Sequence, residues 1–344
     1  MDALENGAVR GSAADRAAAA VSGASAAAMG AAFGADVDRQ LRAIRNRTTS
    51  MGCAECVVNE EMPYVNAWVN AEGDYRKLDA DNTLAGYKMS SWGATLGVDV
   101  DFTNRLTAGL AVTAMQGDFT ANSAEQATGD LDRIYVSAFA RYAHRAWTHT
   151  FVATLGKADT SLERTVNYGT GSYTTKGDSD GTAFGLMYEA GYTKALDEDG
   201  STCLQPLFNI SYRHSSLGGY TETGSDAALR VGSADMDTVS FGLGARLQSV
   251  VGTSVYNRAS LFECRALLRL DAGDRDAAVK SNFTGLAGDH SVKSAEVGAF
   301  GLELGAGLTL PMSVDAGNIF MDVSMELRSG YSSVNGTVGY RINF

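Results

Sequence analysis

The chain has 344 residues, of which 45% are hydrophobic and 20% are charged, and its formal net charge is −12. This acidic balance disfavours nucleic acid as a partner, because proteins that bind nucleic acid present clusters of basic residues. No stretch of about 18 consecutive apolar residues occurs, which excludes a membrane-spanning helix. A membrane-spanning β-barrel is compatible with the composition, because every second residue of its strands is polar or small.

The N-terminal part predicts a long α-helix. Residues 1–11 lack the basic start and the apolar core of a secretory signal, so the chain is either cytoplasmic or a fragment. Residues 12–50 are rich in alanine and free of proline, which favours a thin helix, with a flexible alanine-glycine linker as the alternative. Arg39, Arg42 and Arg45 recur at every third residue, so they lie close to one helical face.

Residues 51–62 form a connection that contains the pair Cys53 and Cys56. A Cys-x-x-Cys spacing supplies half of a zinc site, but the chain has no second pair with that spacing. We therefore predict no metal site. In an oxidising compartment the simplest interpretation of the pair is a local disulfide.

From residue 63 to residue 344 the sequence consists of segments in which apolar and polar residues alternate. Examples are SWGATLGVDVDF at 91–102 and AFGLELGAGLTL at 299–310. Such alternation is typical of strands with one apolar and one polar face. Clusters of glycine, asparagine and aspartate separate the segments, so this region is predicted to be all-β.

The polar face of these strands is unlike ordinary solvent-exposed surface. It combines arginines and carboxylates with small residues, and lysine is scarce, as in a crowded polar interior. This inside-out pattern indicates a barrel with lipid outside and a hydrated or plugged lumen inside. The charged residues predicted to face the lumen include Glu189, Arg213, Arg246, Glu303, Glu326 and Arg341.

Twelve strands are predicted, an even number as in single-chain bacterial outer-membrane barrels. Short connections, such as 103–104, 144–146 and 311–316, follow even strands, whereas long polar ones, such as 165–181 and 272–291, mostly follow odd strands. Because periplasmic turns are short and external loops are long, the helix should end on the periplasmic side and thread the lumen. Its arginines would then meet Glu189, Glu303 or Glu326. The twelve predicted strands are 63–76, 87–101, 105–119, 130–143, 147–162, 182–196, 203–216, 234–248, 256–271, 294–310, 317–328 and 332–344.

The order of helix and strands, together with the stretch from Trp92 to Phe119, resembles the C-terminal translocator domain of type V autotransporters. The stretch is similar to that family's aromatic-Gly-x-x-x-Gly-x-Asp hairpin followed by Leu-x-x-Gly-x-Ala. The matching residues are Gly93, Gly97, Asp99, Leu106, Gly109 and Ala111.

The resemblance implies a monomeric barrel of about twelve strands in the outer membrane of a Gram-negative bacterium. Such a domain anchors an N-terminal passenger and assists its export to the cell surface. Residues 1–11 would be a passenger remnant or a cloning start, residues 12–50 the linker helix, residues 51–62 the periplasmic connection and residues 63–344 the barrel. No cofactor is implied.

Apolar and polar residues alternate along the last strand, which ends at an aromatic residue, Phe344. By the same resemblance, Tyr340, Ile342 and Phe344 form the signal that the outer-membrane barrel assembly machinery reads, with periplasmic chaperones as further partners. The alternative is an ordinary C-terminal edge strand.

We expect no catalysis from this chain. None of its four histidines falls in a nucleophile or metal motif, and His214 and Ser215, adjacent in a strand, point apart. Some autotransporters cut their own linker at an asparagine inside the barrel, and Asn46 is a conceivable site by position. The rival functions are a porin-like channel without a helix in the lumen and an outer-membrane barrel hydrolase.

Overall fold

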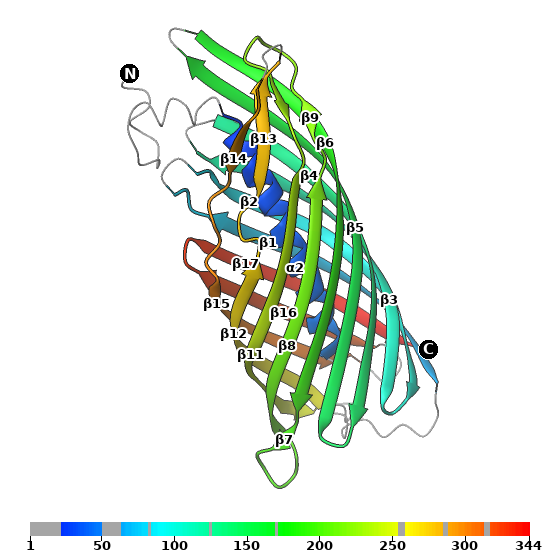
Figure 1. The fold of residues 1–344 in the computed structure, drawn as a ribbon. Helices are drawn as coiled ribbons and strands as arrows, with labels where there is room; N and C mark the ends of the chain where they lie inside the picture. The colour runs from blue at the N-terminus through cyan, green and yellow to red at the C-terminus, as the bar shows by residue number, and fades with distance from the viewer. Residues whose placement is uncertain are drawn as a thin grey trace.

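The computed structural model describes residues 22–49, 63–81, 84–123, 126–168, 171–253, 259–284, 288–312 and 317–344. Twelve long antiparallel strands close into a barrel around one helix, α2 (Ala24–Thr49) (Figure 1). The prediction of a twelve-stranded antiparallel barrel is therefore confirmed. The barrel strands are β1 (Tyr64–Leu78), β2 (Gly86–Thr103), β3 (Leu106–Asn122), β4 (Gln126–His144), β5 (Trp147–Tyr168), β6 (Gly171–Tyr192), β8 (Thr202–Leu217), β11 (Ala234–Thr253), β12 (Ala259–Gly273), β15 (Phe300–Pro311), β16 (Asn318–Arg328) and β17 (Tyr331–Asn343).

Pairing between the first and last strands closes the barrel. β17 lies antiparallel to β1, with Ile342 opposite Ala67, while β8 pairs with β11 and β12 pairs with β15. A further two-residue strand, β7 (Lys194–Ala195), pairs with the start of β8. Because each strand has a neighbour on both sides, the backbone groups of the wall can be satisfied within lipid.

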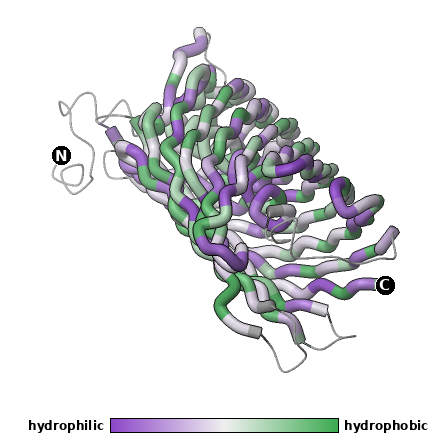
Figure 2. Tube along the Cα trace, turned by 90° about the horizontal axis from the view of Figure 1, so that it is seen from below, coloured by the Kyte–Doolittle hydropathy of each residue, from purple (hydrophilic) through white to green (hydrophobic). Residues whose placement is uncertain are grey.

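The two faces of each barrel strand differ as the alternation predicts. On β2, Trp92 and Leu96 are 65% and 63% exposed, whereas Thr95 between them on the other face is 2% exposed. Figure 2 shows hydrophobic and hydrophilic residues alternating along the strands. Large apolar side chains therefore cover the outside, and polar side chains fill the inside.

Glycines on the inner face make room for aromatic rings. A Cβ atom on Gly97 would lie 2.1 Å from the ring of Trp68, its partner across the β1–β2 pair. A Cβ atom on Gly339 would clash in the same way with the ring of Phe320, the residue opposite it on β16. These pairs let bulky rings lie flat on the wall and leave space for the helix.

The predicted long loop at 165–181 is wrong. β5 and β6 continue as a paired ladder to Tyr168 and from Gly171, with Val166 opposite Tyr173. The long hairpin projects beyond the neighbouring strands (Figure 1). Other strand ends also shift: the strand predicted to reach Leu196 ends at Tyr192, and the one predicted from Ser294 begins at Phe300.

Two long connections fold into a second, small sheet instead of open loops. Its strands are β9 (Tyr220–Thr221), β10 (Leu229–Val231), β13 (Ala278–Phe283) and β14 (His290–Lys293), in the order β14-β13-β10-β9. This cap sheet lies at the end of the barrel where α2 begins (Figure 1). The prediction of 272–291 as loop therefore missed β13 and the start of β14.

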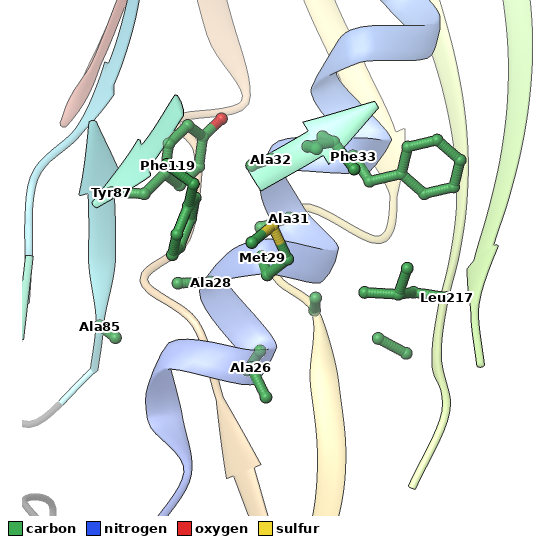
Figure 3. Close-up of a cluster of buried hydrophobic side chains, with 14 of the residues drawn as sticks. Ala26, Ala28, Met29, Ala31, Ala32, Phe33, Ala85, Tyr87, Phe119 and Leu217 are labelled. Carbon is green, nitrogen blue, oxygen red and sulfur yellow. The ribbon is translucent and has the colours of Figure 1, made fainter. Parts of the chain in front are cut away.

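The first half of α2 passes through an apolar collar. Ala28, Met29 and Phe33 are 2% exposed or less, and they pack among side chains from the barrel wall and the cap sheet. Figure 3 shows Tyr87 and Phe119 on one side of the helix and Leu217 on the other. The small alanine side chains thus allow this half of the helix to be enclosed on all sides. The predicted helix start at residue 12 lies outside the described residues, as do 1–11 and 51–62.

Candidate functional site

The second half of α2 carries the three predicted arginines into a buried network of charges. Arg39 Nη1 donates to Glu72 Oε2 on β1 at 2.6 Å. Arg42 Nη2 lies 2.8 Å from Glu326 Oε2 on β16, and its Nε lies 3.0 Å from Asp38 of the helix itself. All of these side chains are at least nine-tenths buried, so the charges are compensated inside the lumen.

Arg45 and Arg47 extend the network to the last turn of the helix. Arg45 forms ion pairs with Glu303 on β15 and, at 3.6 Å, with Glu189 on β6. The guanidinium of Arg47 lies 5.0 Å from the ring centre of Trp68 and 4.7 Å from that of Phe320. A cation between two aromatic faces is stabilised by the negative potential of both rings.

Two aspartates of α2, which sequence reasoning missed, also attach the helix to the wall. Asp36 lies 2.7 Å from Arg76 Nη2 and 3.3 Å from Arg133 Nη1, and its Oδ2 accepts a 2.6 Å hydrogen bond from Tyr135. On the opposite side, Asp38 lies 2.7 Å from Arg269 Nη2. Ion pairs therefore join helix and wall in both senses: arginines of the helix meet carboxylates of the wall, and aspartates of the helix meet arginines of the wall.

Asp38 also lies 3.5 Å from Arg213, one of the charged residues that the sequence predicts to face the lumen. Arg213 in turn pairs with Asp271 at 2.9 Å. The remaining predicted charges pair within the wall: Arg246 with Glu189 at 3.0 Å, and Arg341 with Asp99 at 2.9 Å.

A polar space remains on one side of α2. The helix packs mainly against β4, β5, β6 and β8. Toward β16, β17 and β1 it leaves a cavity bounded by Arg39, Arg42 and Asn335. A second space opens near the end of the helix, beside Asn46 and Glu263. The helix thus fills most of the lumen and leaves small polar spaces on this side.

Comparison with known proteins identifies this architecture. The family model of the autotransporter β-domain matches residues 67–324. The chain belongs to this family. It is therefore an outer-membrane barrel of the autotransporter translocator type from a Gram-negative bacterium.

Individual relatives are distant in sequence. Outer membrane protein A of Rickettsia rickettsii is 24% identical over 294 residues, which are 81% of this chain but only 12% of the relative. The esterase EstA of Pseudomonas aeruginosa is 25% identical over 188 residues, covering 54% of this chain and 29% of the relative. The chain thus spans a small part of the length of these curated relatives.

Solved translocator structures share the fold. The translocator domain of the autotransporter NalP from Neisseria meningitidis aligns with a TM-score of 0.70 at 16% identity, covering 92% of this chain and 99% of that one. The transport unit of AIDA-I from Escherichia coli aligns with a TM-score of 0.54 at 13% identity, covering 84% and 93%. At these identities the likeness concerns the fold alone.

The C-terminal strand of this translocator barrel lies in the closing seam. Tyr340 is opposite Val69 and Ile342 is opposite Ala67. The Phe344 N–H donates to the Val65 carbonyl at 2.9 Å, and the residue is 73% exposed. The terminal aromatic side chain therefore lies on the outside, at the end where α2 ends.

The other candidate residues form no recognisable site. His214 Nδ1 lies 3.0 Å from Asp237 on the outer face, while the neighbouring Ser216 donates to Asp235. Asn46 accepts from Arg45 and donates to Asp322 at 3.2 Å. Cys53 and Cys56 lie outside the described residues.

Two features are absent from the part of the chain that the structure describes. Among those residues, no three His, Cys, Asp or Glu side chains come together as a metal site would require. No described helix has the length and the apolar character to cross a membrane.

Proposed function

We propose that this barrel exports an N-terminal passenger through its lumen and then holds the end of that passenger as the plug α2. The observation that carries the proposal is the helix itself, which runs the length of the lumen and pairs with carboxylates and arginines from the surrounding strands. Such reciprocal pairing supports a native, final position for the helix and not an accidental one.

The orientation follows from the two ends of the barrel. The extended β5–β6 hairpin and the cap sheet lie where α2 begins, and the two-residue turn after β2 lies at the other end. Because external loops are longer than periplasmic turns, the N-terminus of α2 faces the cell exterior. A passenger attached to the front of α2 would therefore be outside the cell.

The proposal assigns no catalytic step to the barrel. It includes the barrel assembly machinery and periplasmic chaperones as partners, with Tyr340, Ile342 and Phe344 as the signal they read, and a monomeric state. In the periplasm Cys53 and Cys56 would form a local disulfide. Self-cleavage at Asn46 is the competing enzymatic hypothesis, and replacing Asn46 by alanine would then abolish release of the passenger.

The test is single-channel conductance in planar bilayers. We compare the full chain with a variant that lacks residues 1–47, and use a variant lacking only residues 1–21 as the matched control. The full chain and the control should conduct weakly, because α2 occupies the lumen, and the longer deletion should conduct several times more. Equal conductance in all three would contradict the plug and favour a porin-like channel.

A further inference from the structure

Three exposed basic residues follow one another along the periplasmic rim. Arg105 lies in the β2–β3 turn, Arg145 in the β4–β5 turn and Lys194 in β7. Two backbone hydrogen bonds of 2.7 Å join the three segments. The Ala143 N–H donates to the Arg105 carbonyl, and the Thr193 N–H donates to the Ala146 carbonyl. The three cations thus belong to one continuous sector of the rim.

These cations have no carboxylate partner among the described residues. At the external end, two exposed lysines form ion pairs: Lys176 with Glu163 at 2.7 Å and Lys293 with Asp276 at 2.9 Å. The acidic residues 197–199 belong to the β7–β8 turn, which projects below the rim (Figure 1). Among the described residues, none of the three rim cations forms an ion pair with these carboxylates, so all three remain available to a ligand.

A cluster of aromatic and imidazole rings lies on the outer wall just above this sector. Trp147 packs edge-on against Tyr192 at 5.2 Å between ring centres, and His149 Nδ1 lies 2.8 Å from the Tyr188 hydroxyl. Amphipathic rings of this kind mark the level of lipid headgroups. The members of the cluster are Tyr142, His144, Trp147, His149, Tyr188 and Tyr192.

An apolar groove begins at the same cluster and runs up the outer wall. Tyr188 forms its lower edge, with Phe151 at 4.9 Å between ring centres. Small residues on β4 and β5, Ala138, Ala140 and Ala153, form part of its lining. The groove lies within the lipid-facing band, so hydrocarbon is the only medium available to fill it.

The outer wall has the opposite charge at its far end. Asp132, Asp159 and Asp180 face one another across β4, β5 and β6 and are all exposed. The exposed Lys157 lies two residues from Asp159 on the same face, so this level still carries more negative than positive charge. An anionic headgroup is therefore less favoured there than at the periplasmic end of the same strands.

We infer that this rim sector binds an anionic phospholipid of the periplasmic leaflet. Its phosphate lies among Arg105, Arg145 and Lys194, its glycerol region lies against the aromatic cluster and one acyl chain lies in the groove. Each basic residue near a phosphate layer contributes roughly a fivefold gain in affinity. This lipid site is independent of the helix and of passenger export.

The experiment uses the full chain in nanodiscs of phosphatidylcholine containing a minority of phosphatidylglycerol. Native mass spectrometry after release counts the lipids that stay bound. The unmodified chain should retain one phosphatidylglycerol in preference to phosphatidylcholine. The variant R105Q/R145Q/K194Q should lose this preference by roughly a hundredfold, since three basic contacts are removed.

Two further variants separate the headgroup from the acyl chain. The matched control K176Q/R230Q/K293Q removes three exposed positive charges from the external end and should retain phosphatidylglycerol as before. Ala153→Phe fills the groove without changing any charge, and retention should fall severalfold. Equal retention of the two lipids by the unmodified chain overturns the inference, and so does undiminished retention by either the rim triple variant or Ala153→Phe.

Discussion

Asp36 of α2 pairs with two arginines of the barrel wall. It lies within 3.3 Å of Arg76 and Arg133, and it accepts a hydrogen bond from Tyr135. Asp36→Ala would leave Arg133 without a carboxylate partner among the described residues. Removing one member of a buried ion pair typically costs about 3–5 kcal/mol, so we expect a large loss of barrel stability.

The measurement is the denaturant midpoint of the refolded barrel in lipid vesicles. Asp118→Ala is the control, because it removes an exposed carboxylate that faces Asp130 across β3 and β4 and should cost nothing or stabilise slightly. Equal midpoints for Asp36→Ala and Asp118→Ala would show that the helix is not held by its charges.

Asp197 in the β7–β8 turn predicts a pH dependence outside the membrane. Its carboxylate accepts hydrogen bonds from the Thr202 backbone N–H and the Ser201 hydroxyl, which lower its pKa from 3.8 to about 2. A lowered pKa means that the charged form is favoured in the folded turn. The stabilisation is therefore complete above about pH 4 and is lost as the pH falls through about 2.

NMR titration of the Asp197 carboxyl carbon would check this value. A midpoint for Asp197 at or above its ordinary pKa of 3.8 would contradict the hydrogen-bonded turn.

Sequence reasoning could predict arginines on α2 but not the aspartates beside them. Asp36 and Arg39 are spaced i, i+3, and Asp38 and Arg42 are spaced i, i+4, which is also the pattern of a solvated helix surface. Only the positions of Arg76, Arg133 and other wall residues, set by strand register, show that these carboxylates are shared with the barrel. Register across twelve strands cannot be deduced from local alternation.

At the level of elements, the cap sheet is attached to the extended β5 by one buried ion pair. Arg164 donates from Nε and Nη2 to the two carboxylate oxygens of Glu222, at 3.0 and 2.6 Å, and Glu222 also accepts from the Leu229 N–H. Glu222→Ala would remove the carboxylate that pairs with Arg164 and would leave the Leu229 N–H without this acceptor. We expect the free energy needed to open the cap sheet locally to fall by about 3–5 kcal/mol, while the barrel remains folded.

Hydrogen exchange read by mass spectrometry would show this as faster exchange in β9 and β10 with unchanged protection in β2 and β3. The double variant Arg164→Met with Glu222→Leu should restore much of the protection, because apolar residues can replace a buried pair. Uniform acceleration across the whole barrel would mean that cap and barrel unfold together.

The cap and the β5–β6 extension escaped prediction for one physical reason. Alternation identifies a strand when one face meets lipid, but residues 163–167 and 171–181 lie beyond the lipid-facing band and carry polar side chains on the outer face and mixed ones on the inner face. This stretch is also rich in glycine, threonine and aspartate, a composition that is typical of turns. The membrane-embedded strands were predictable because lipid imposes the apolar face.

At the scale of the whole molecule, the lipid band can be placed from the outward residues of β5. Trp147 lies at one edge and Asp159 at the other, a separation of about 30 Å along the membrane normal for a tilted strand. This height matches the hydrocarbon core of a bilayer, about 30 Å. Leu155, which is 61% exposed, then lies near the middle of the band.

Leu155→Arg should therefore destabilise the barrel by about 2–4 kcal/mol, since a charge on the lipid face is costly near the midplane. Asn167→Arg is the matched control, because it places the same side chain on the same face of β5 but outside the bilayer, where the cost is close to zero. Denaturant titration in vesicles measures both. A depth-independent cost would mean that this face of β5 is not embedded, whereas the expected gradient locates the membrane on the barrel.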